Sequence, residues 1–382
     1  MINMEPTAQH LIHLRQLLHA NPELSGYEEN TAAYITGFLK KLNPDEIMTG
    51  IGGHGILVLF DSCKPGPTLL FRSELDALPI YEINDFPHRS VVDGVSHTCG
   101  HDGHTTILCG LAEKLAAEKP ASGKVYLLFQ PAEETGEGAA KVVADKKFYI
   151  NPDFVFALHN LPGFEAGHIV VRDGLFSAAV NSIIIKLKGK TAHAAEPEFG
   201  INPASAISEI IAFADQLNNN HPEEANFQLV TPVHINMGTA AYGVSAGDAE
   251  LHYTLRCWDN DKLRNLETAL INRSTAIAAG SGLQLAHAFT QTFYANDNNK
   301  EANDVVRASA QQNGFILEEK IVPFKWAEDF GYFTSQFKGC MFGLGAGTGH
   351  PALHNPDYDF PDDITATGIQ IFHSITKNIL PA

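Results

Sequence analysis

One short segment of the sequence concentrates residue types that bind transition metals. In VSHTCGHDGH these side chains are His97, Cys99, His101, Asp102 and His104. Divalent transition metals take imidazole, thiolate and carboxylate ligands that converge from several segments, and the small glycine between Cys99 and His101 lets both turn toward one ion. The segment therefore predicts part of a metal site, although any one of its histidines taken alone is more often a surface residue or a hydrogen-bonded core residue.

A pair of adjacent acidic residues offers a second kind of chemistry. Glu133 and Glu134 follow Pro131, which ends the preceding apolar run. Adjacent side chains in extended chain point opposite ways, so one carboxylate can face a metal while its neighbour faces a water molecule. Metal-assisted hydrolysis needs this division of roles. A solvated acidic loop is the commoner explanation of a bare Glu-Glu pair.

Other kinds of catalysis have less support in the sequence. Cys99 could act as a nucleophile, but His101 two residues away and the further ligand-type residues favour metal binding. Ser245 in 243–247 matches the letters Gly-x-Ser-x-Gly, but the segment predicted after it is a strand rather than the helix that a nucleophile elbow requires, so Ser-His-Asp catalysis is not favoured. The glycines of 343–349 lack the Lys-Ser/Thr ending of a phosphate-binding loop and are interpreted as tight turns.

The segments that must position these residues alternate between short apolar runs and helical patterns. Strands buried on both faces read as continuous apolar runs, so the sequence predicts a largely parallel or mixed sheet flanked by helices. Ligand sites in such sheets lie beyond the carboxyl ends of the strands. The strands are predicted at 56–60, 68–71, 125–129, 154–158 and 340–344. The chemistry-bearing residues that follow them are Arg72, Glu74, Asp76, Glu133, Glu134, His159, His350 and His354.

Helical patterns occur before, between and after these strands. The first helix has Leu11, Leu14 and Leu18 at helical spacing, and Ser25 with Glu28 has the spacing of a capping box that starts a second. Later helices are predicted at 105–117, 139–148, 302–312 and 364–380.

A change of pattern near residue 177 predicts a second domain. The polar and apolar positions of its strands alternate, which is typical of a sheet with one exposed face. The polar stretch 296–300 has the composition of an exit linker. We therefore expect a catalytic domain formed by 1–176 and 292–382, interrupted by a small α+β domain at 177–291. Its predicted strands lie at 181–187, 250–258 and 283–293, and its predicted helices at 203–217 and 262–279.

The composition is that of a soluble globular protein of about two domains. The 382 residues carry a formal net charge of −18, and 44% of them are hydrophobic. Nucleic acids and anionic lipids are bound by clustered Lys and Arg, so this charge argues against both as partners. No apolar run reaches the length of a membrane span and the N-terminus lacks signal-peptide features, so we expect a cytoplasmic protein. Five scattered cysteines argue against a disulfide framework.

Six motifs together resemble one family of enzymes. In the same order along the chain, they resemble the motifs of the dimetal aminoacylase and carboxypeptidase family, in its hippurate hydrolase and auxin-conjugate amidohydrolase branch. The match spans nearly the whole chain, and several motifs in order are far more specific than one. The motifs are FRSELDALP (71–79), HTCGHDGH (97–104), FQPAEETGEGA (129–139), ALHNLPG (157–163), GKTAHAAEP (189–197) and LHNPDYDF (353–360).

The resemblance implies a catalytic domain with two divalent ions and an inserted ferredoxin-like domain that serves as a lid or in dimerisation. Zinc and manganese are the first candidates for the ions, and a homodimer through the inserted domain is expected. The Cys99 thiolate would take a bridging place between the ions. By motif match the metal ligands would be Cys99, His101, Glu134, His159 and His354.

The resemblance also implies catalytic and substrate-binding roles. Glu133 would be the general base that deprotonates the attacking water and returns the proton to the leaving amine. Asp76 would orient His101. His193 would stabilise the tetrahedral oxyanion, in many relatives from the partner subunit, and Arg256 would hold the substrate carboxylate.

Two departures from the family pattern bear on this transfer. The first motif usually reads Arg-Ala-Asp-Met-Asp, whereas here Glu74 replaces the first Asp, which predicts an altered surrounding of the metal ligands. A usual Asn in the inserted domain, which helps to position the substrate, is Gly243 here. Substrate preference is therefore expected to differ from that of the relatives for which the branch is named.

The sequence thus predicts a metal-dependent amidohydrolase that cleaves N-acyl amino acids, with hippurate-like or N-acetyl substrates. A dipeptidase or carboxypeptidase acting on short peptides is the alternative within enzymes. A binding protein that keeps the fold without turnover is the alternative from another class, but all predicted ligands and Glu133 are present.

Overall fold

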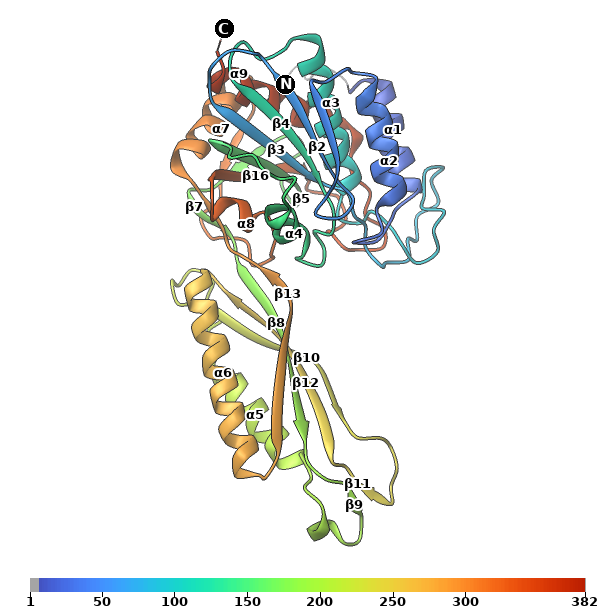
Figure 1. Ribbon diagram of the computed structural model, residues 1–382, viewed down its shortest axis with the longest axis vertical. Helices are drawn as coiled ribbons and strands as arrows, with labels where there is room; N and C mark the ends of the chain where they lie inside the picture. The colour runs from blue at the N-terminus through green and yellow to red at the C-terminus, as the bar shows by residue number, and fades with distance from the viewer. Residues whose placement is uncertain (1–6, 382) are drawn as a thin grey trace. The chain divides into compact units, whose positions relative to one another are not determined.

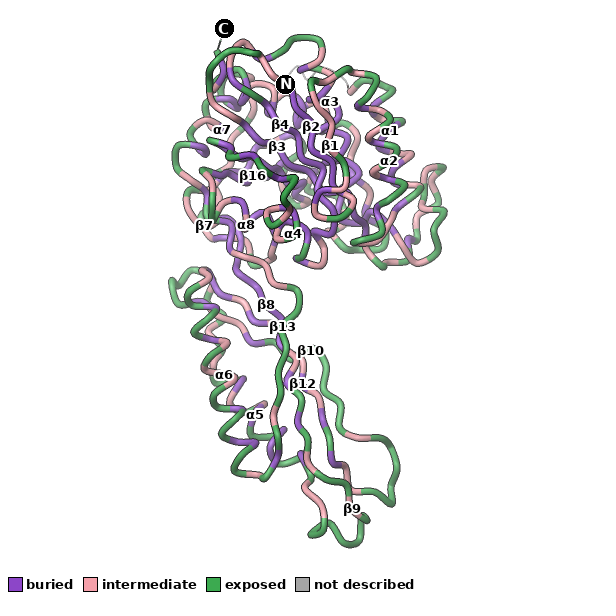
Figure 2. The backbone as a smooth tube through the Cα atoms, in the orientation of Figure 1, coloured by how far each residue is buried: buried purple, intermediate pink, exposed green. Residues whose placement is uncertain are grey.

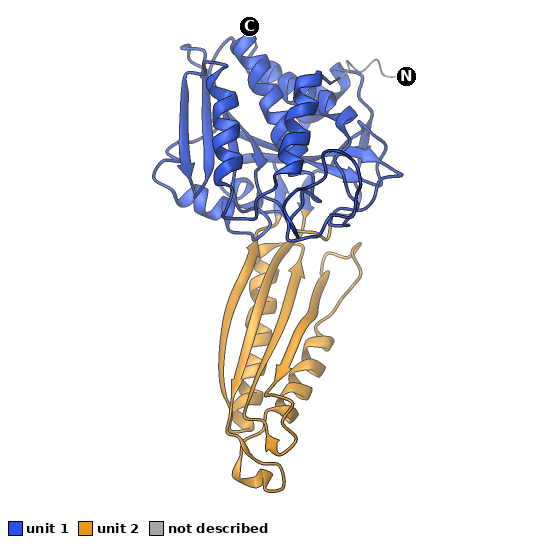
Figure 3. Cartoon of the chain, turned by 90° about the vertical axis from the view of Figure 1, so that its right-hand side faces the viewer, with its two compact units in different colours: residues 1–176, 296–321, 328–382 blue, residues 177–295, 322–327 orange. Residues whose placement is uncertain are grey.

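The computed structural model describes residues 7–381, and the chain forms two compact units (Figure 3). The first unit contains the chain up to Phe176, the segment Asn296–Ile321 and the chain from Glu328 onward. The second unit contains Ser177–Ala295 and Val322–Ala327. It ends at Ala295 rather than at the predicted residue 291, and it includes a separate short segment that was not predicted.

A mixed eight-stranded sheet forms the centre of the first unit (Figure 1). Neighbouring strands β3, β4, β5 and β16 are joined in parallel, and antiparallel pairs join β1 to β2, β2 to β4 and β16 to β6. The predicted mixed sheet flanked by helices is confirmed. In spatial order the strands are β1 (Glu46–Ile51), β2 (Gly55–Asp61), β4 (Lys124–Gln130), β3 (Thr68–Glu74), β5 (Phe154–Pro162), β16 (Lys338–Gly347), β6 (Ile169–Val171) and β15 (Leu317–Glu319).

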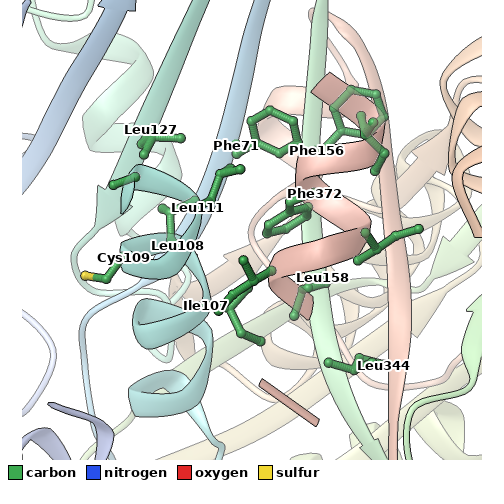
Figure 4. Close-up of a cluster of buried hydrophobic side chains, with 14 of the residues drawn as sticks. Phe71, Ile107, Leu108, Cys109, Leu111, Leu127, Phe156, Leu158, Leu344 and Phe372 are labelled. Carbon is green, nitrogen blue, oxygen red and sulfur yellow. The ribbon is translucent and has the colours of Figure 1, made fainter. Parts of the chain in front are cut away.

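Helices bury the apolar strands of this sheet. Figure 4 shows side chains of α3 and α9, among them Leu111 and Phe372, with Phe71 and Phe156 of the sheet in one core. Two short helices, α4 (Gly138–Ala144) and α8 (Gly331–Thr334), contact each other and strands β4 and β16 respectively. Figure 2 shows the central strands buried along most of their length. The helices that contribute to the core are α1 (Gln9–Ala20), α2 (Glu29–Lys40), α3 (His101–Ala117), α7 (Lys300–Gln312) and α9 (Thr365–Ile379).

The start of α2 differs from the predicted capping box. Ser25 Oγ donates to Asp76 Oδ2 at 2.6 Å, and Glu28 Oε1 accepts from the main-chain N–H of Ala132 at 2.8 Å. The first N–H groups of α2 bind the Glu23 carboxylate instead. The prediction was wrong because both polar side chains bond to distant segments, which local spacing does not reveal.

The second unit is a four-stranded antiparallel sheet covered by two helices. The chain order β8-α5-β10-β12-α6-β13 is the βαββαβ arrangement of ferredoxin-like domains. A separate two-stranded antiparallel sheet pairs β9 (Ala192–His193) with β11 (Val244–Ser245). The spatial order of the strands is β10 (Gln228–Met237), β12 (Asp248–Cys257), β8 (Ala179–Lys188) and β13 (Gln284–Phe293), and the helices are α5 (Ala204–Gln216) and α6 (Asn260–Gly280).

Several strands were not predicted, among them β10 and β1, and one predicted linker is structured. β10 contains Pro232, where its register with β12 shifts, and proline normally argues against a strand interior. β1 is a short edge strand with a glycine near its end. The stretch predicted as an exit linker contains β14 (Asn296–Asn298), which pairs with β7 (Gly174–Ser177). Buried Asn298 donates to the carbonyl of Met341 at 2.7 Å, so this polar side chain makes an internal hydrogen bond instead of facing solvent.

Other boundaries shift by several residues. α4 ends at Ala144 rather than at 148, and α3 begins at His101 rather than near 105. Within residues 7–381, no helix has the length and apolar character needed to cross a membrane.

Candidate metal centre

The segment 97–104 turns sharply into α3 and presents two ligand-type side chains. Gly100 lies just before the helix with a φ of 90°, and a Cβ there would come within 2.6 Å of Asn160 Oδ1. Only glycine fits this backbone conformation and this close approach. Cys99 and His101 flank it, and both are buried.

Hydrogen bonds at Nδ1 orient two of the predicted histidine ligands. Nδ1 of His101 donates to the main-chain carbonyl of Asp76 at 3.0 Å, and Nδ1 of His159 donates to that of Asn160 at 2.9 Å. This assignment leaves the lone pair of Nε2 in each ring available to an ion, which is the usual arrangement of metal-binding histidines. His159 Nε2 lies 3.6 Å from Cys99 Sγ.

Glu134 and His354 complete the predicted ligand set from two further loops. The main-chain N–H of Glu134 donates to Asp76 Oδ2 at 2.9 Å. The main-chain N–H of His354 donates to the carbonyl of Thr98, which ties this loop to the segment before Cys99. His354 has a φ of 65°, an uncommon conformation for a residue with a side chain, and its side chain is 52% exposed.

The five predicted ligands form two groups that share one atom. Cys99, His101 and His159 make one group, and Cys99, Glu134 and His354 make the other. Within them, Cys99 Sγ lies 3.6 Å from His159 Nε2, and His354 Nε2 lies 3.8 Å from Glu134 Oε2. Ligand atoms around a tetrahedral ion with bonds of about 2.0–2.3 Å lie roughly 3.3–3.8 Å apart. The geometry therefore suits two neighbouring ions with the thiolate between them.

The polar atoms of these groups are buried and need a cation. His101 Nε2 and Glu134 Oε1 are buried without a hydrogen-bond partner. Burial and the charges of the two glutamates raise the pKa of the Cys99 thiol, and burial raises the pKa of Glu134 to about 7. Burial alone would lower the pKa of His101, but the carboxylates of Asp76 and Glu74 raise it to about 10. The raised pKa of His101 shows that carboxylates gather here, and bound divalent ions supply the positive charge that this buried site lacks.

Glu133 lies beside these groups in the loop after β4. Its Oε1 accepts from the main-chain N–H of Asp329 at 3.2 Å, and its Oε2 lies 3.9 Å from His101 Nε2. Burial and the neighbouring charges of Glu328 and Glu134 raise its pKa well above the usual range. A carboxylate with a raised pKa takes up a proton readily, and this one lies beside the predicted ligand His101.

Asp76 is fully buried and contacts two predicted ligands. Its main-chain carbonyl accepts from His101, its Oδ1 lies 3.4 Å from the same Nδ1, and its Oδ2 accepts from the main chain of Glu134. The predicted orienting contact with His101 thus has a geometric counterpart, and the contact with Glu134 is additional.

Glu74, the first departure from the family pattern, is buried close to the predicted ligand His101. Its Oε2 accepts from His104 Nδ1 at 2.7 Å, and its Oε1 accepts from the buried guanidinium of Arg72. Nε2 of His104 in turn accepts from the main-chain N–H of Asn160 at 3.0 Å. The longer carboxylate therefore joins Arg72 to α3 and does not contact Asp76.

A buried acidic pair near this site was not predicted. Arg72 Nη2 donates to Glu328 Oε1 at 3.0 Å and to Asp329 Oδ1 at 2.6 Å, and both acidic residues are at most 1% exposed. These residues follow no predicted strand and lie in no motif described above. The available signal was their position between two aromatic residues, Trp326 and Phe330, where a charged pair needs a buried partner.

Asp102 belongs to a second cluster of buried charged residues. His19 of α1 donates from Nδ1 to Asp102 Oδ2 at 2.8 Å and from Nε2 to Glu82 Oε1 at 3.2 Å. Burial would lower its pKa, but these two carboxylates raise the pKa of His19 to about 9. Arg15 binds Asp359, which lies on the loop that carries His354.

His193 and Arg256 belong to the second unit. His193 lies exposed in the two-stranded β9–β11 sheet, where its Nδ1 accepts from the main-chain N–H of Ala195 at 3.1 Å, so Nε2 carries the proton. The main-chain N–H of Ala194 donates to the carbonyl of Gly243 at 3.0 Å. Arg256 lies half-buried in β12 and donates to the carbonyl of Lys325 at 2.8 Å.

Comparisons with known proteins agree with this geometry. The model of peptidase family M20/M25/M40 matches residues 70–378. The chain is 31% identical over 352 residues to N-acetyldiaminopimelate deacetylase of Listeria welshimeri serovar 6b, covering 90% of this chain and 92% of that protein. It is 28% identical over 384 residues to N-acetyl-L-cysteine deacetylase of Bacillus subtilis strain 168, covering 99% and 90%. A dinuclear metal-binding peptidase of the M20 family from Bacillus subtilis has a TM-score of 0.82 and 27% identity, covering 97% and 98%.

The predicted dimetal family is confirmed, whereas its hippurate hydrolase and auxin-conjugate branch stays a prediction. The cofactors are two divalent metal ions, as in the dinuclear relative and in keeping with the ligand groups of this chain. The protein is a hydrolase of linear amides. The match over most of the chain shows that it belongs to peptidase family M20/M25/M40.

Proposed function

We propose that the protein cleaves the amide bond of N-acyl amino acids and releases a carboxylic acid and an amino acid. The observation that carries this proposal is the pair of ligand groups that share Cys99 and lie beside Glu133. The two deacetylases named above act on N-acetylated amino acids, which supports an N-acyl substrate here. The hippurate and auxin-conjugate branch remains the finer prediction.

The ligands would be Cys99, His101 and His159 for one ion and Cys99, Glu134 and His354 for the other. When bound, two divalent ions would lower the pKa of a water molecule and polarise the amide carbonyl. Zinc and manganese both accept these ligand types.

Glu133 would move the proton. One oxygen is held by Asp329, and the other faces His101, so the carboxylate is placed to take a proton from the attacking water as the oxygen–carbon bond forms. It would return this proton to the amine nitrogen as the carbon–nitrogen bond breaks. Asp76 would keep His101 and Glu134 in place through its hydrogen bonds.

His193 and Arg256 would bind the substrate. The hydrogen bond from Ala195 leaves the proton of His193 on Nε2, from which it can donate to the tetrahedral oxyanion. Arg256 would hold the carboxylate of the amino acid in a two-point contact, which an acidic protein needs in order to bind an anion.

We also propose that the protein forms a homodimer through the second unit. β10 is an edge strand of its sheet, and Val233, Ile235 and Met237 on it are each at least 40% exposed. An exposed edge with apolar residues favours sheet extension by a second copy. Light scattering of the wild type and of an Ile235→Lys variant tests this, because the variant should be a monomer.

Turnover of a substrate panel tests the proposed reaction. The protein is stripped by a chelator, reloaded with zinc or manganese, and assayed on N-acetyl and N-benzoyl amino acids and on dipeptides. Metal should restore release of free amino acid from the N-acyl compounds, and turnover of dipeptides alone would contradict the substrate class.

In Glu133→Gln, kcat should fall by about 10²–10⁴ with both ions retained. Glu137→Gln, which alters an exposed glutamate of the same loop, is the matched control; a near wild-type rate in Glu133→Gln would overturn the role of Glu133.

A further inference from the structure

The loop that carries Glu133 and Glu134 is held by one distant residue at three points. The carboxylate of Asp329 accepts from Nε2 of Gln130 at 2.9 Å, at the start of the loop. It accepts from the main-chain N–H of Ala139 at 2.8 Å, at the end of the loop. The main-chain N–H of Asp329 donates to Oε1 of Glu133 in the middle. A single residue thus fixes both ends of the loop and the side chain that the mechanism uses.

Arg72 makes this arrangement stable in a buried environment. Its Nη2 binds Asp329, and its two Nη groups bind both oxygens of Glu328 at 3.0 and 3.3 Å. Burying carboxylates without a cation is costly, and the guanidinium offsets part of this cost. Burial and the charge of Glu328 nevertheless raise the pKa of Asp329 well above its usual range, while Arg72 acts against this rise. Its Nε also donates to Oε1 of Gln130 at 2.9 Å. Since this oxygen is occupied, the amide nitrogen of Gln130 must face Asp329.

The two adjacent glutamates have different anchors. Glu133 is held through its side chain by Asp329, which leaves its second oxygen facing His101. Glu134 is held through its main chain by Asp76 on another segment. A change at Asp329 should therefore displace the general base more than the metal ligand beside it.

We propose that Asp329 is a positioning residue for Glu133, acting through the hydrogen bond from its main chain and through its three-point hold on the loop 130–139. The inference rests on the proposed function, because Glu133 is the general base only in that reaction. Arg72 and Glu328 support Asp329 in this role.

The variant Asp329→Asn tests the proposal. Oδ1 of Asp329 accepts from Gln130 and Arg72, and Oδ2 accepts from Gln130 and Ala139. An asparagine NH2 therefore meets an N–H group in either orientation. We expect kcat to fall by about 10–10², because a shift of about 1 Å at a catalytic group has this effect, while KM changes less than about threefold. Two ions should remain bound.

Hydrogen exchange of the loop gives a second readout that does not need turnover. The N–H groups of Gly136 and Gly138 bond within the loop, to Glu133 and Ala132, and should exchange faster in Asp329→Asn. Glu82→Gln is the matched control, since it alters a buried, paired carboxylate of the same unit that does not contact this loop. It should leave kcat and loop exchange unchanged.

Unchanged loop exchange, or an unchanged kcat of the folded variant, would overturn the proposal, and so would a loss of metal that accounts for the lost rate. If the wild type turns over no N-acyl amino acid, the proposed function fails, while the exchange comparison still tests the hold on the loop. Should Asp329→Asn not fold, Gln130→Met removes the tie at the start of the loop together with the acceptor for Nε of Arg72, and it leaves the bonds of Asp329 to Ala139 and Glu133 in place. It should give a smaller fall in kcat and faster exchange of the same amides, and wild-type values of both would contradict the role of Asp329.

Discussion

Most residues predicted to bind metal are buried, with His354 as the exception, whereas the residues predicted to bind substrate are exposed or half-buried. Cys99, His101 and His159 are buried in the first unit, and further buried groups hold the two histidine rings. His193 in the second unit is exposed, and its ring accepts from the main-chain N–H of Ala195 two residues away, while Arg256 is half-buried on an open sheet face. Burial fixes the geometry that ions require, whereas exposure leaves side chains accessible to a substrate. Changes in the first group should therefore affect binding of ions and stability, and changes in the second should affect turnover alone.

The largest effect is expected at the shared ligand. Cys99→Ala removes the one atom common to both groups, so one or both ions should be lost and turnover should fall with them. Metal content by mass spectrometry measures this. Cys109→Ala, which alters another buried cysteine of the first unit outside every ligand group, should keep both ions. Two tightly held ions in Cys99→Ala would indicate a nucleophile or an incidental thiol instead.

A smaller effect is expected at the exposed histidine. His193→Ala should lower kcat roughly 10²-fold, as removal of an oxyanion donor does, with a change in Tm below about 2 °C. His221→Ala, at another exposed histidine of the second unit, should change neither quantity. A large drop in Tm for His193→Ala would show that the stability of the β9–β11 sheet depends on the imidazole. The expected difference between the buried metal ligands of the first unit and the exposed residues of the second would then not hold.

The first unit alone should lose stability in alkaline solution. The folded-state pKa of His19 is about 9, above the ordinary 6.5, so the stabilisation is complete below about pH 6.5 and is lost as pH rises through 9. Its size is on the order of 3 kcal/mol. Both tryptophans lie in the second unit, so their fluorescence should not follow this loss, whereas hydrogen exchange of α1 and α3 should. His19→Asn should be less stable at pH 6.5 and should lose less stability between pH 6.5 and 9 than the wild type, while a pH-dependent loss of the same size in that variant would contradict the assignment.

The smallest effect on stability is expected at Gly243. A Cβ at this position would meet no atom within 4 Å, so Gly243→Asn should leave Tm unchanged. It should nevertheless change the ratio of kcat/KM between N-acetyl and N-benzoyl amino acids by a few-fold, because the carbonyl of Gly243 accepts from the main-chain N–H of Ala194, next to His193. An unchanged ratio would show that this departure from the family pattern does not set substrate preference.

The sequence predicted those features that depend on residue type and local pattern. Apolar runs located the central strands, and the motifs located the ligand-type residues around Cys99. It did not reveal Glu328 and Asp329, because their partner Arg72 lies more than 250 positions away in the chain. Ser25 was misassigned for the same reason, since its hydroxyl bonds to Asp76 rather than to its own helix.

The unequal exposure of the two ligand groups has a consequence for how ions enter and leave. All three members of the group with His159 are buried, whereas the group with His354 includes a side chain that is 52% exposed. Dialysis against a chelator should therefore proceed in two kinetic phases, with the ion at His354 departing first. The half-loaded intermediate could be refilled with a different element, which would yield a heterobimetallic enzyme with a distinct metal at each position.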